Sequence, residues 1–438
     1  MPNPNREAVR VAVLADSDTR WKWGALTARR IAPSTAVDLH GFLLRGRATP
    51  TARQLAEVGA HADRLDEVTG AEFLRTMRDG GYDLLVLALV GGGVQAMLHG
   101  LAAQAAERRP VVVTGYVGVV YEKLADGLLL RHGADVVLAN SRHDADRFTA
   151  VYEGVGADPS CVTEAALPFL GGEPYRPRED RDTVVFAAQP SVPATRADRG
   201  YLLRRLAEHA RLHPRREVLL KLRSRPGEQT THVEELPYQR LAERLPGGLP
   251  PNLKLVYGNM GEVLDRTDLL VTVSSTAALE ALHRRIPTAI LTDLGVRETL
   301  GNHHFLGSGL LASWDMLDGG HRPLPDAHWL SRQGVAADGS YEHSFDAARS
   351  RVAELLLQPR RDPLRPYYTP LTAPGYLPGL LARHHLAPDG TPLAAAVPGT
   401  GPTGLRRVVR GALRGAARGA YRHGVQRVAP VIRRMGEL

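Results

Sequence analysis

Short, almost continuously apolar runs recur along the 438-residue chain, and segments with helical spacing separate them. In the first part of the chain the apolar runs are residues 9–14, 37–44, 84–90, 111–114 and 136–139, and helical spacing appears at 23–31, 52–65 and 70–79. Strands that are apolar on both faces are typical of parallel sheets with helices on either side. The pattern therefore predicts an α/β fold.

A second series of the same kind follows a Gly/Pro/Arg-rich linker at 171–178. Its expected strands are 183–187, 217–222, 253–257, 269–273 and 288–291, and its expected helices are 200–212, 237–245 and 276–284. We expect two Rossmann-like domains, residues 1–172 and 173–357, that face a central cleft at the carboxyl ends of their strands. A Pro-rich connector at 358–404, with one short helix near 379–385, leads to a basic tail at 405–438.

The net charge of +8 belongs to the tail. Residues 401–438 hold nine arginines and a single acidic residue, Glu437, so residues 1–400 are formally neutral. This distribution argues against nucleic-acid binding by the folded part. The tail arginines recur every four residues from Arg406 to Arg422, which predicts a basic amphipathic helix docking on an anionic membrane surface. A solvated, disordered tail is the alternative.

The remaining composition favours a cytoplasmic protein, either free or peripheral on the inner membrane face. The apolar run 84–90 is far shorter than a membrane span, and the first residues lack the apolar core of a signal peptide. The single cysteine, Cys161, excludes an internal disulfide and a cysteine-based zinc site. Adjacent histidines at 303–304 project apart, so we expect neither a bound metal nor a cofactor.

The strongest motif is the apolar run 269–273 that leads into Ser274, Ser275 and Thr276 and then into a helix. Free N–H groups and the positive end of the helix dipole attract a phosphate at such a turn, and hydroxyl groups add donors. Glu280, one turn later, could accept a hydrogen bond from a ribose hydroxyl. Ordinary helix capping by either serine is the alternative.

A second motif places Lys221, Arg223 and Arg225 after the strand at 217–222. Strand alternation would put these cations on one side, where they could neutralise a diphosphate or phosphodiester leaving group. A solvated edge is the alternative. Gln189, in the loop after 183–187, offers an amide to the same cleft.

In the first domain, the loop at 16–23 packs two carboxylates, two cations and two indoles after a strand. Asp16 or Asp18, desolvated by a neighbouring tryptophan, could serve as a general base. Arg20 and Trp21, with Tyr116 from a second loop, are the candidate acceptor-binding residues. Helix capping by either aspartate is the alternative. Three glycines at 91–93 lack the dinucleotide-binding spacing and predict a close-approach turn.

The order of these motifs resembles GT-B glycosyltransferases. It comprises Asn140-Ser141, Leu167-Pro168, Gln189-Pro190, the basic loop, and the serine turn with Glu280. The serine pair is similar to that of bacterial sialyltransferases, Kdo transferases and capsule-polymer transferases. The chain also resembles an uncharacterised glycosyltransferase group of actinobacteria over about residues 9–320.

The resemblance implies that Ser274 and Ser275 hold the donor phosphate, that Glu280 holds the nucleotide sugar, and that Asp16 or Asp18 deprotonates the acceptor. It also implies a metal-independent, inverting glycosyltransferase that moves a sugar, CMP-activated in those relatives, to a cell-envelope glycan or lipid-linked acceptor. Arg225-Pro226 departs from the His-Pro of the CMP-sugar enzymes. Three alternatives stay open: a nucleotide-sugar 2-epimerase, a teichoic-acid-type polyol-phosphate transferase, and a non-catalytic glycan- or nucleotide-binding scaffold.

Overall fold

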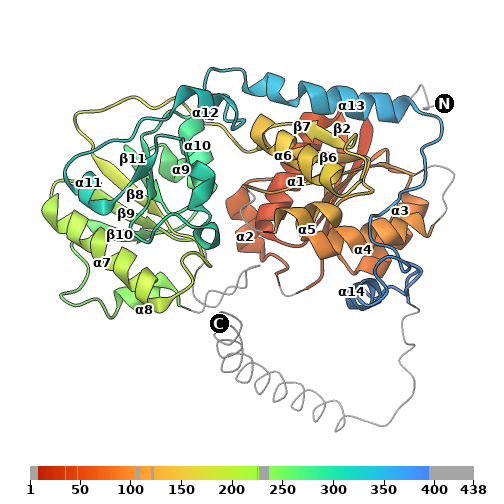
Figure 1. The fold of residues 1–438 in the computed structure, drawn as a ribbon, viewed down its shortest axis with the longest axis horizontal. Coiled ribbons are helices and arrows are strands. Elements are labelled where there is room, and N and C mark those ends of the chain that lie inside the picture. The colour runs from red at the N-terminus through yellow and green to blue at the C-terminus, as the bar shows by residue number, and fades with distance from the viewer. Residues whose placement is uncertain are drawn as a thin grey trace, which may run out of the picture. The chain divides into compact units, whose positions relative to one another are not determined.

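The computed structural model describes residues 8–34, 36–46, 48–104, 109–119, 123–223, 225 and 236–393. One compact unit runs from Met1 to Pro392 and contains two parallel β-sheets (Figure 1). The predicted basic tail at 405–438 lies outside the described residues. Within those residues, no helix has both the length and the apolar character needed to cross a bilayer.

The first sheet has seven parallel strands in the order β3-β2-β1-β4-β5-β6-β7. Its strands are β1 (Val9–Ala15), β2 (Val37–Leu44), β3 (Arg64–Val68), β4 (Leu84–Ala88), β5 (Val111–Gly115), β6 (Val136–Ala139) and β7 (Val162–Glu164). The helices between them are α1 (Asp18–Ile31), α2 (Ala52–Val58), α3 (Gly70–Gly80), α4 (Gly91–Ala102), α5 (Leu124–Leu129) and α6 (Arg142–Gly154). The strand order reverses at β1, which pairs with both β2 and β4.

The second sheet has six parallel strands in the order β10-β9-β8-β11-β12-β13. Its strands are β8 (Thr183–Ala187), β9 (Glu217–Lys221), β10 (Leu253–Val256), β11 (Leu269–Thr272), β12 (Thr288–Leu291) and β13 (Leu311–Ala312). Its helices are α7 (Arg196–Leu212), α8 (Tyr238–Ala242), α9 (Met260–Leu264), α10 (Ala277–His283), α11 (Trp314–Asp318) and α12 (Ala327–Ser331), with short 3₁₀ helices at Glu298–Leu300 and Asn302–Phe305. The predicted α/β class with two Rossmann-like sheets is therefore confirmed.

The buried strands explain the apolar runs in the sequence. Val11 and Val13 of β1 pack into one core cluster with α1, while Ala12 and Leu14 pack into the opposite cluster with α3 and α4. Adjacent residues of a strand face opposite sides of the sheet, so a sheet covered on both faces needs apolar side chains at every position.

The helix predicted at 52–65 is wrong in its second half. It ends at Val58, because Gly59 adopts a left-handed backbone conformation with φ of 64° and stops the helix. Residues 64–68 instead form the edge strand β3, whose outer positions are exposed and give little apolar signal. The short edge strands β7 and β13 were likewise not predicted.

The glycine run at 91–93 does not form the predicted turn. It opens α4, where Gly93 and Val94 donate their backbone N–H groups to the carbonyl of Val90. The loop predicted at 16–23 is also wrong, because Ser17 caps α1 and the helix begins at Asp18.

The last described elements pack against the first sheet, although the sequence assigned them elsewhere. Helix α13 (Asp346–Leu357), preceded by a 3₁₀ helix at Tyr341–Phe345, lies within the predicted second domain but contacts α1 and β7 (Figure 1). Helix α14 (Leu377–Arg383) lies within the predicted connector and contacts α4. Leu377 and Leu381 are fully buried there, so this part of the connector belongs to the first core rather than to an extended linker.

Candidate functional site

A cavity of about 500 Å³ is lined by residues that follow strands of both sheets. It borders the ends of β1 and β5 in the first sheet and of β8, β9 and β11 in the second. Strands β1 and β8 are the two points at which the strand order reverses. Parallel α/β sheets bind ligands at such points, so we treat this cavity as the candidate active site. We call it the donor cavity, after the role proposed for it below.

Of the two candidate bases, only Asp18 lines the donor cavity. It is the first residue of α1, its side chain is 15% exposed, and its Oδ1 accepts from Thr19 Oγ1 at 3.3 Å. Asp16 has both oxygens engaged: Oδ1 accepts from Arg20 Nη1 at 2.8 Å and Oδ2 from the Val90 N–H at 3.1 Å. Asp16 therefore joins the end of β1 to the start of α4, and Asp18 is the better placed base.

All three residues of the serine turn line the cavity, and Ser274 also anchors the turn. Ser274 is fully buried, and its Oγ donates to the Leu300 carbonyl at 2.5 Å. Gln189 Oε1 accepts from the Ser274 N–H at 3.0 Å, so the predicted amide holds the turn in place. Ser275 Oγ accepts from the Ala277 N–H at 3.2 Å, which is the capping contact weighed as its alternative role.

Thr276 begins α10 without a side-chain cap and faces the loop after β5. A Cβ atom at Gly118 would lie only 2.4 Å from Thr276 Oγ1, so any larger residue there would require the Thr276 side chain to move. The serine turn thus approaches the first sheet closely at the cavity wall.

Of the three cations predicted to act together, Lys221 and Arg223 line the donor cavity and Arg225 does not. Lys221 ends β9 with 8% exposure, and its Nζ donates to the Leu222 carbonyl at 2.8 Å. Arg223 lies across the cavity, where its Nη2 donates to Asp18 Oδ1 at 2.9 Å and also bonds to Thr19. Arg225 is exposed, lies with its guanidinium 5.6 Å from the Tyr257 ring centroid, and does not line the cavity. The alternation predicted for Arg225 is wrong because the strand ends at Lys221.

Burial shifts the titration of two groups in the cavity. It lowers the pKa of Lys221 to about 8, although Glu57 and Glu280 oppose the shift. It raises the pKa of Glu280, while nearby Lys22 acts in the opposite direction. Desolvation of this kind strengthens electrostatic contacts to a ligand.

Sequence reasoning did not select Lys22 and Glu57 as site residues, yet both line the cavity. Lys22 lies one helical turn after Asp18 and its Nζ is 5.1 Å from the Phe169 ring centroid. Residues 18, 19 and 22 have the spacing of one helix face, so a helix beginning at Asp18 would have predicted that they line the same cavity. Interpreting this segment as a loop hid that pattern.

The candidate acceptor-binding residues do not gather around the donor cavity. Trp21 is 1% exposed, and its indole Nε1 donates to the Ala60 carbonyl at 3.2 Å, so it is a core residue. The Tyr116 hydroxyl is buried and its ring lies 3.9 Å from the Arg131 guanidinium carbon. Both predictions are wrong because these rings pack inward. Arg20 pairs with Asp16 and lines a second cavity instead.

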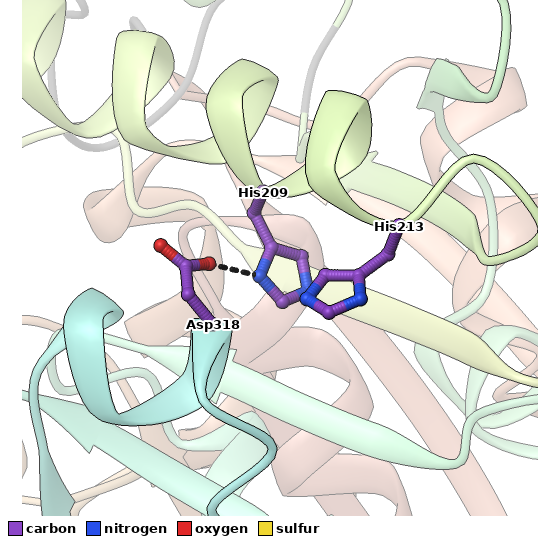
Figure 2. A group of neighbouring side chains, drawn as sticks. All are labelled: His209, His213 and Asp318. Carbon is purple, nitrogen blue, oxygen red and sulfur yellow. Dashed lines mark hydrogen bonds and ion pairs between the residues drawn. The ribbon is translucent and has the colours of Figure 1, made fainter.

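His209, His213 and Asp318 form a titratable cluster at the end of α7 and in α11 (Figure 2). Their ligand-type atoms lie within 4.8 Å of one another. His209 Nδ1 contacts Asp318 Oδ1 at 2.6 Å, and Arg216 Nη1 contacts His209 Nε2 at 2.9 Å. Arg205 Nη2 also bonds to Asp318 Oδ2 at 2.8 Å. Both ring nitrogens of His209 are engaged and two cations flank the group, so this cluster is a buried network that ties α7 to α11.

The donor cavity can support displacement chemistry at a phosphate-activated carbon. Three of its described lining residues are acidic and three are basic, namely Asp18, Glu57, Glu280, Lys22, Lys221 and Arg223. A carboxylate from one sheet thus faces cations from the other. Two Rossmann-like domains with the site at their strand ends define the GT-B class.

The chain belongs to the family described as “Putative glycosyltransferase (DUF6716)”, whose model matches residues 11–355. No curated protein sequence matches it. Among solved structures, a MnaA–UDP complex from S. aureus is similar at TM-score 0.52 and 10% identity, covering 81% of this chain and 99% of that one. The UDP-GlcNAc 2-epimerase of Methanocaldococcus jannaschii gives TM-score 0.51 and 10% identity, with 80% and 100% covered. These similarities establish the shared fold.

Proposed function

We propose that the protein transfers a sugar from a nucleotide-sugar donor to a cell-envelope glycan or lipid-linked acceptor at the cytoplasmic membrane face. The observation that carries this proposal is the meeting of Asp18 with Lys221 and Arg223 in one cavity between two sheets. The family description supports the transferase class.

Asp18 is the proposed general base. It would take the proton of the acceptor hydroxyl while the acceptor oxygen attacks the anomeric carbon of the donor sugar. The bond from that carbon to the phosphate oxygen breaks, and its electron pair leaves with the nucleotide. Attack opposite the leaving group inverts the anomeric centre. A positioned base of this kind contributes about 10²–10⁴-fold to the rate.

Lys221 and Arg223 are the proposed partners of the departing phosphate. Cations held in a partly desolvated cavity stabilise negative charge that develops in the transition state. They supply this charge from the protein, so we propose a metal-independent reaction, for which retention of activity in excess EDTA is the expected result. Ser275 and Thr276 would add hydroxyl donors at the start of α10.

The ion pair between Asp18 and Arg223 suggests an order of binding. Arg223 Nη2 lies 2.9 Å from Asp18 Oδ1, so the arginine neutralises the proposed base. A donor phosphate offers Arg223 a second, more strongly charged partner with geometry suited to a guanidinium. Donor binding would thus free Asp18 for the acceptor, and a donor-first order follows.

A nucleotide-sugar 2-epimerase is the second candidate, because the structures similar to this chain include UDP-GlcNAc 2-epimerases, one of them bound to UDP-GlcNAc. The two reactions differ in their need for an acceptor. An epimerase converts the donor sugar alone, whereas a transferase releases nucleotide only when an acceptor hydroxyl is present.

The first experiment is a thermal-shift panel of UDP, CDP, CMP, GDP and ADP. At a hundredfold excess over Kd, a ligand that binds only the folded state adds about 2.7 kcal/mol. We expect one nucleotide to give a shift that is lost in Lys221→Met and kept in Lys254→Met, since Lys254 is 60% exposed and pairs with Glu217 outside the cavity. If no nucleotide shifts the wild type, the donor-site assignment fails.

The second experiment measures turnover of the nucleotide sugar that the panel identifies. We expect Asp18→Asn to retain nucleotide binding but to lose at least a hundredfold in transfer rate. The exposed carboxylate Asp79 provides the matched control, Asp79→Asn, which should transfer normally. Epimerised donor without acceptor would instead assign the second candidate.

A further inference from the structure

A second cavity of about 420 Å³ lies at the carboxyl edge of the first sheet. It borders the ends of β1, β2, β3 and β4, and its remaining wall comes from the end of α14 and the two residues that follow it. Asp16 lines this cavity and Asp18 lines the donor cavity, so the Asp16–Asp18 turn stands between the two.

The charged and titratable part of the lining of this second cavity is mainly basic. It includes Arg20, Arg45, Arg383, His384 and His385, against Asp16 as its one acidic residue among those described. Asp16 is already neutralised by Arg20 at 2.8 Å. Arg45 forms an ion pair with the exposed Glu67. Arg383 is exposed and has no ion-pair partner in the described part of the chain. Positive charge is therefore left over for a ligand.

The backbone adds to this charge. Gly70 and Val90 line the cavity at the N-terminal ends of α3 and α4. Val90 offers no side-chain cap to α4. Helix N-termini carry partial positive charge and free N–H groups, which favour phosphate and similar anions. The uncapped end of α4 and the side chains of Arg45 and Arg383 converge on this cavity, whereas Thr69 and Glu72 already cap the N-terminus of α3.

The part of the cavity wall contributed by α14 and the residues after it lies outside the segment that defines the family. The family model ends at residue 355, whereas α14 and the residues after it contribute Arg383, His384 and His385. Burial of Leu377 and Leu381 fixes α14 on the first core, so Arg383 and the two histidines have a defined support. Burial lowers the pKa of His384, so Arg383 is the residue of this segment that supplies positive charge.

We propose that this second cavity binds a phosphate group carried by the acceptor. The proposal rests on the proposed transferase function, because it assigns the acceptor class to the same site. A cavity of this volume exceeds one phosphate and accommodates part of the molecule that bears it. The acceptor phosphate would then be held beside the turn that carries the base Asp18.

The test begins with isothermal titration of inorganic pyrophosphate into the full-length protein. A background of Lys221→Gln with Arg223→Gln removes two cations of the donor cavity, and pyrophosphate affinity should stay within about threefold of wild type. Adding Arg45→Gln and Arg383→Gln should weaken it at least tenfold. The matched control is Arg360→Gln, because Arg360 is exposed in the same C-terminal segment and lines neither cavity.

Two results would overturn the second site. One is unchanged pyrophosphate affinity in the Arg45→Gln, Arg383→Gln variant; the other is complete loss of binding on removal of the donor-cavity cations alone. Nucleotide binding by the Arg45→Gln, Arg383→Gln variant checks that the fold is intact. A wild type that binds pyrophosphate here but no nucleotide would refute the donor site and leave the anion site standing.

A second pair of probes separates an acceptor phosphate from a free one. Glucose 6-phosphate should bind at least tenfold more tightly than inorganic phosphate, because the cavity also contacts the group that carries the phosphate. Equal affinities would assign the cavity to free phosphate and overturn the acceptor assignment.

Discussion

Replacing Lys221 by methionine should make the protein more stable and a poorer nucleotide binder. Burial lowers the pKa of Lys221 from 10.5 to about 8. Each pKa unit corresponds to about 1.36 kcal/mol, so holding this ammonium in the folded state at pH 7 costs about 3 kcal/mol. Methionine has a similar length and no charge, so Lys221→Met should raise the free energy of unfolding by up to that amount.

The pH dependence gives the sign of the effect. Between pH 8 and 10.5 the unfolded chain binds more protons at Lys221 than the folded chain, so the wild-type free energy of unfolding rises with pH through this window. The advantage of Lys221→Met should therefore be full below pH 8 and shrink towards pH 10. Denaturant unfolding at pH 7 and pH 10 measures it, with Lys254→Met as the exposed control. A Lys221→Met protein less stable than wild type at pH 7, or an advantage independent of pH, would refute the reasoning.

The same group predicts how nucleotide affinity depends on pH. If the charged ammonium binds the donor phosphates, affinity should fall about tenfold for each pH unit above 8, because a shrinking fraction of free protein carries the charge. Lys221→Arg keeps its charge at every such pH and should remove most of this decline.

Three further outcomes are expected. Burial raises the pKa of Asp144 to about 6, so the wild-type free energy of unfolding should decrease as the pH rises from about 4 to 6. Asp144→Asn should therefore have a free energy of unfolding up to about 3 kcal/mol higher than wild type at pH 7, measured by denaturant unfolding, and a destabilised variant would contradict this. Leu381→Ala in α14 should cost about 2–5 kcal/mol, and a cost below 1 would mean that α14 is not part of the core. Removal of residues 405–438 should abolish co-sedimentation with anionic vesicles at low salt, because each well-placed arginine contributes about 1 kcal/mol to membrane binding. Equal binding by the shortened chain would exclude the tail as a membrane anchor.

The sequence predicted the buried strands well and the edges of the sheets poorly. Strands such as β4 are apolar at every position because helices cover both faces. Strand β3 is exposed at Arg64, Leu65 and Glu67, without alternation, and β13 has only two residues, so neither strand leaves a clear periodic signal. The positions of α13 and α14 depend on contacts far along the chain, which local patterns do not encode.

Site residues at the ends of strands could be predicted from the sequence. Whether a side chain on the following helix packs in the core or lines the cavity could not. Asp18, Lys221 and the serine turn follow strands and line the donor cavity. Trp21 lies three residues after Asp18, which on a helix can share its face, yet its indole enters the core. Only the start of α1 at Asp18, set by Ser17, decides which side chains of this segment face the cavity.

The return of α14 to the first domain bears on how this chain folds during synthesis. Domains generally fold as they emerge, the N-terminal one first. Here the core of the first domain is completed by Leu386, about 220 residues after the end of β7. At about 5–20 residues per second, roughly 10–40 s separate these points on the ribosome. Until then the apolar face awaiting α14 is open to chaperones and aggregation, whereas the second domain, which lies wholly within that interval, can fold at once.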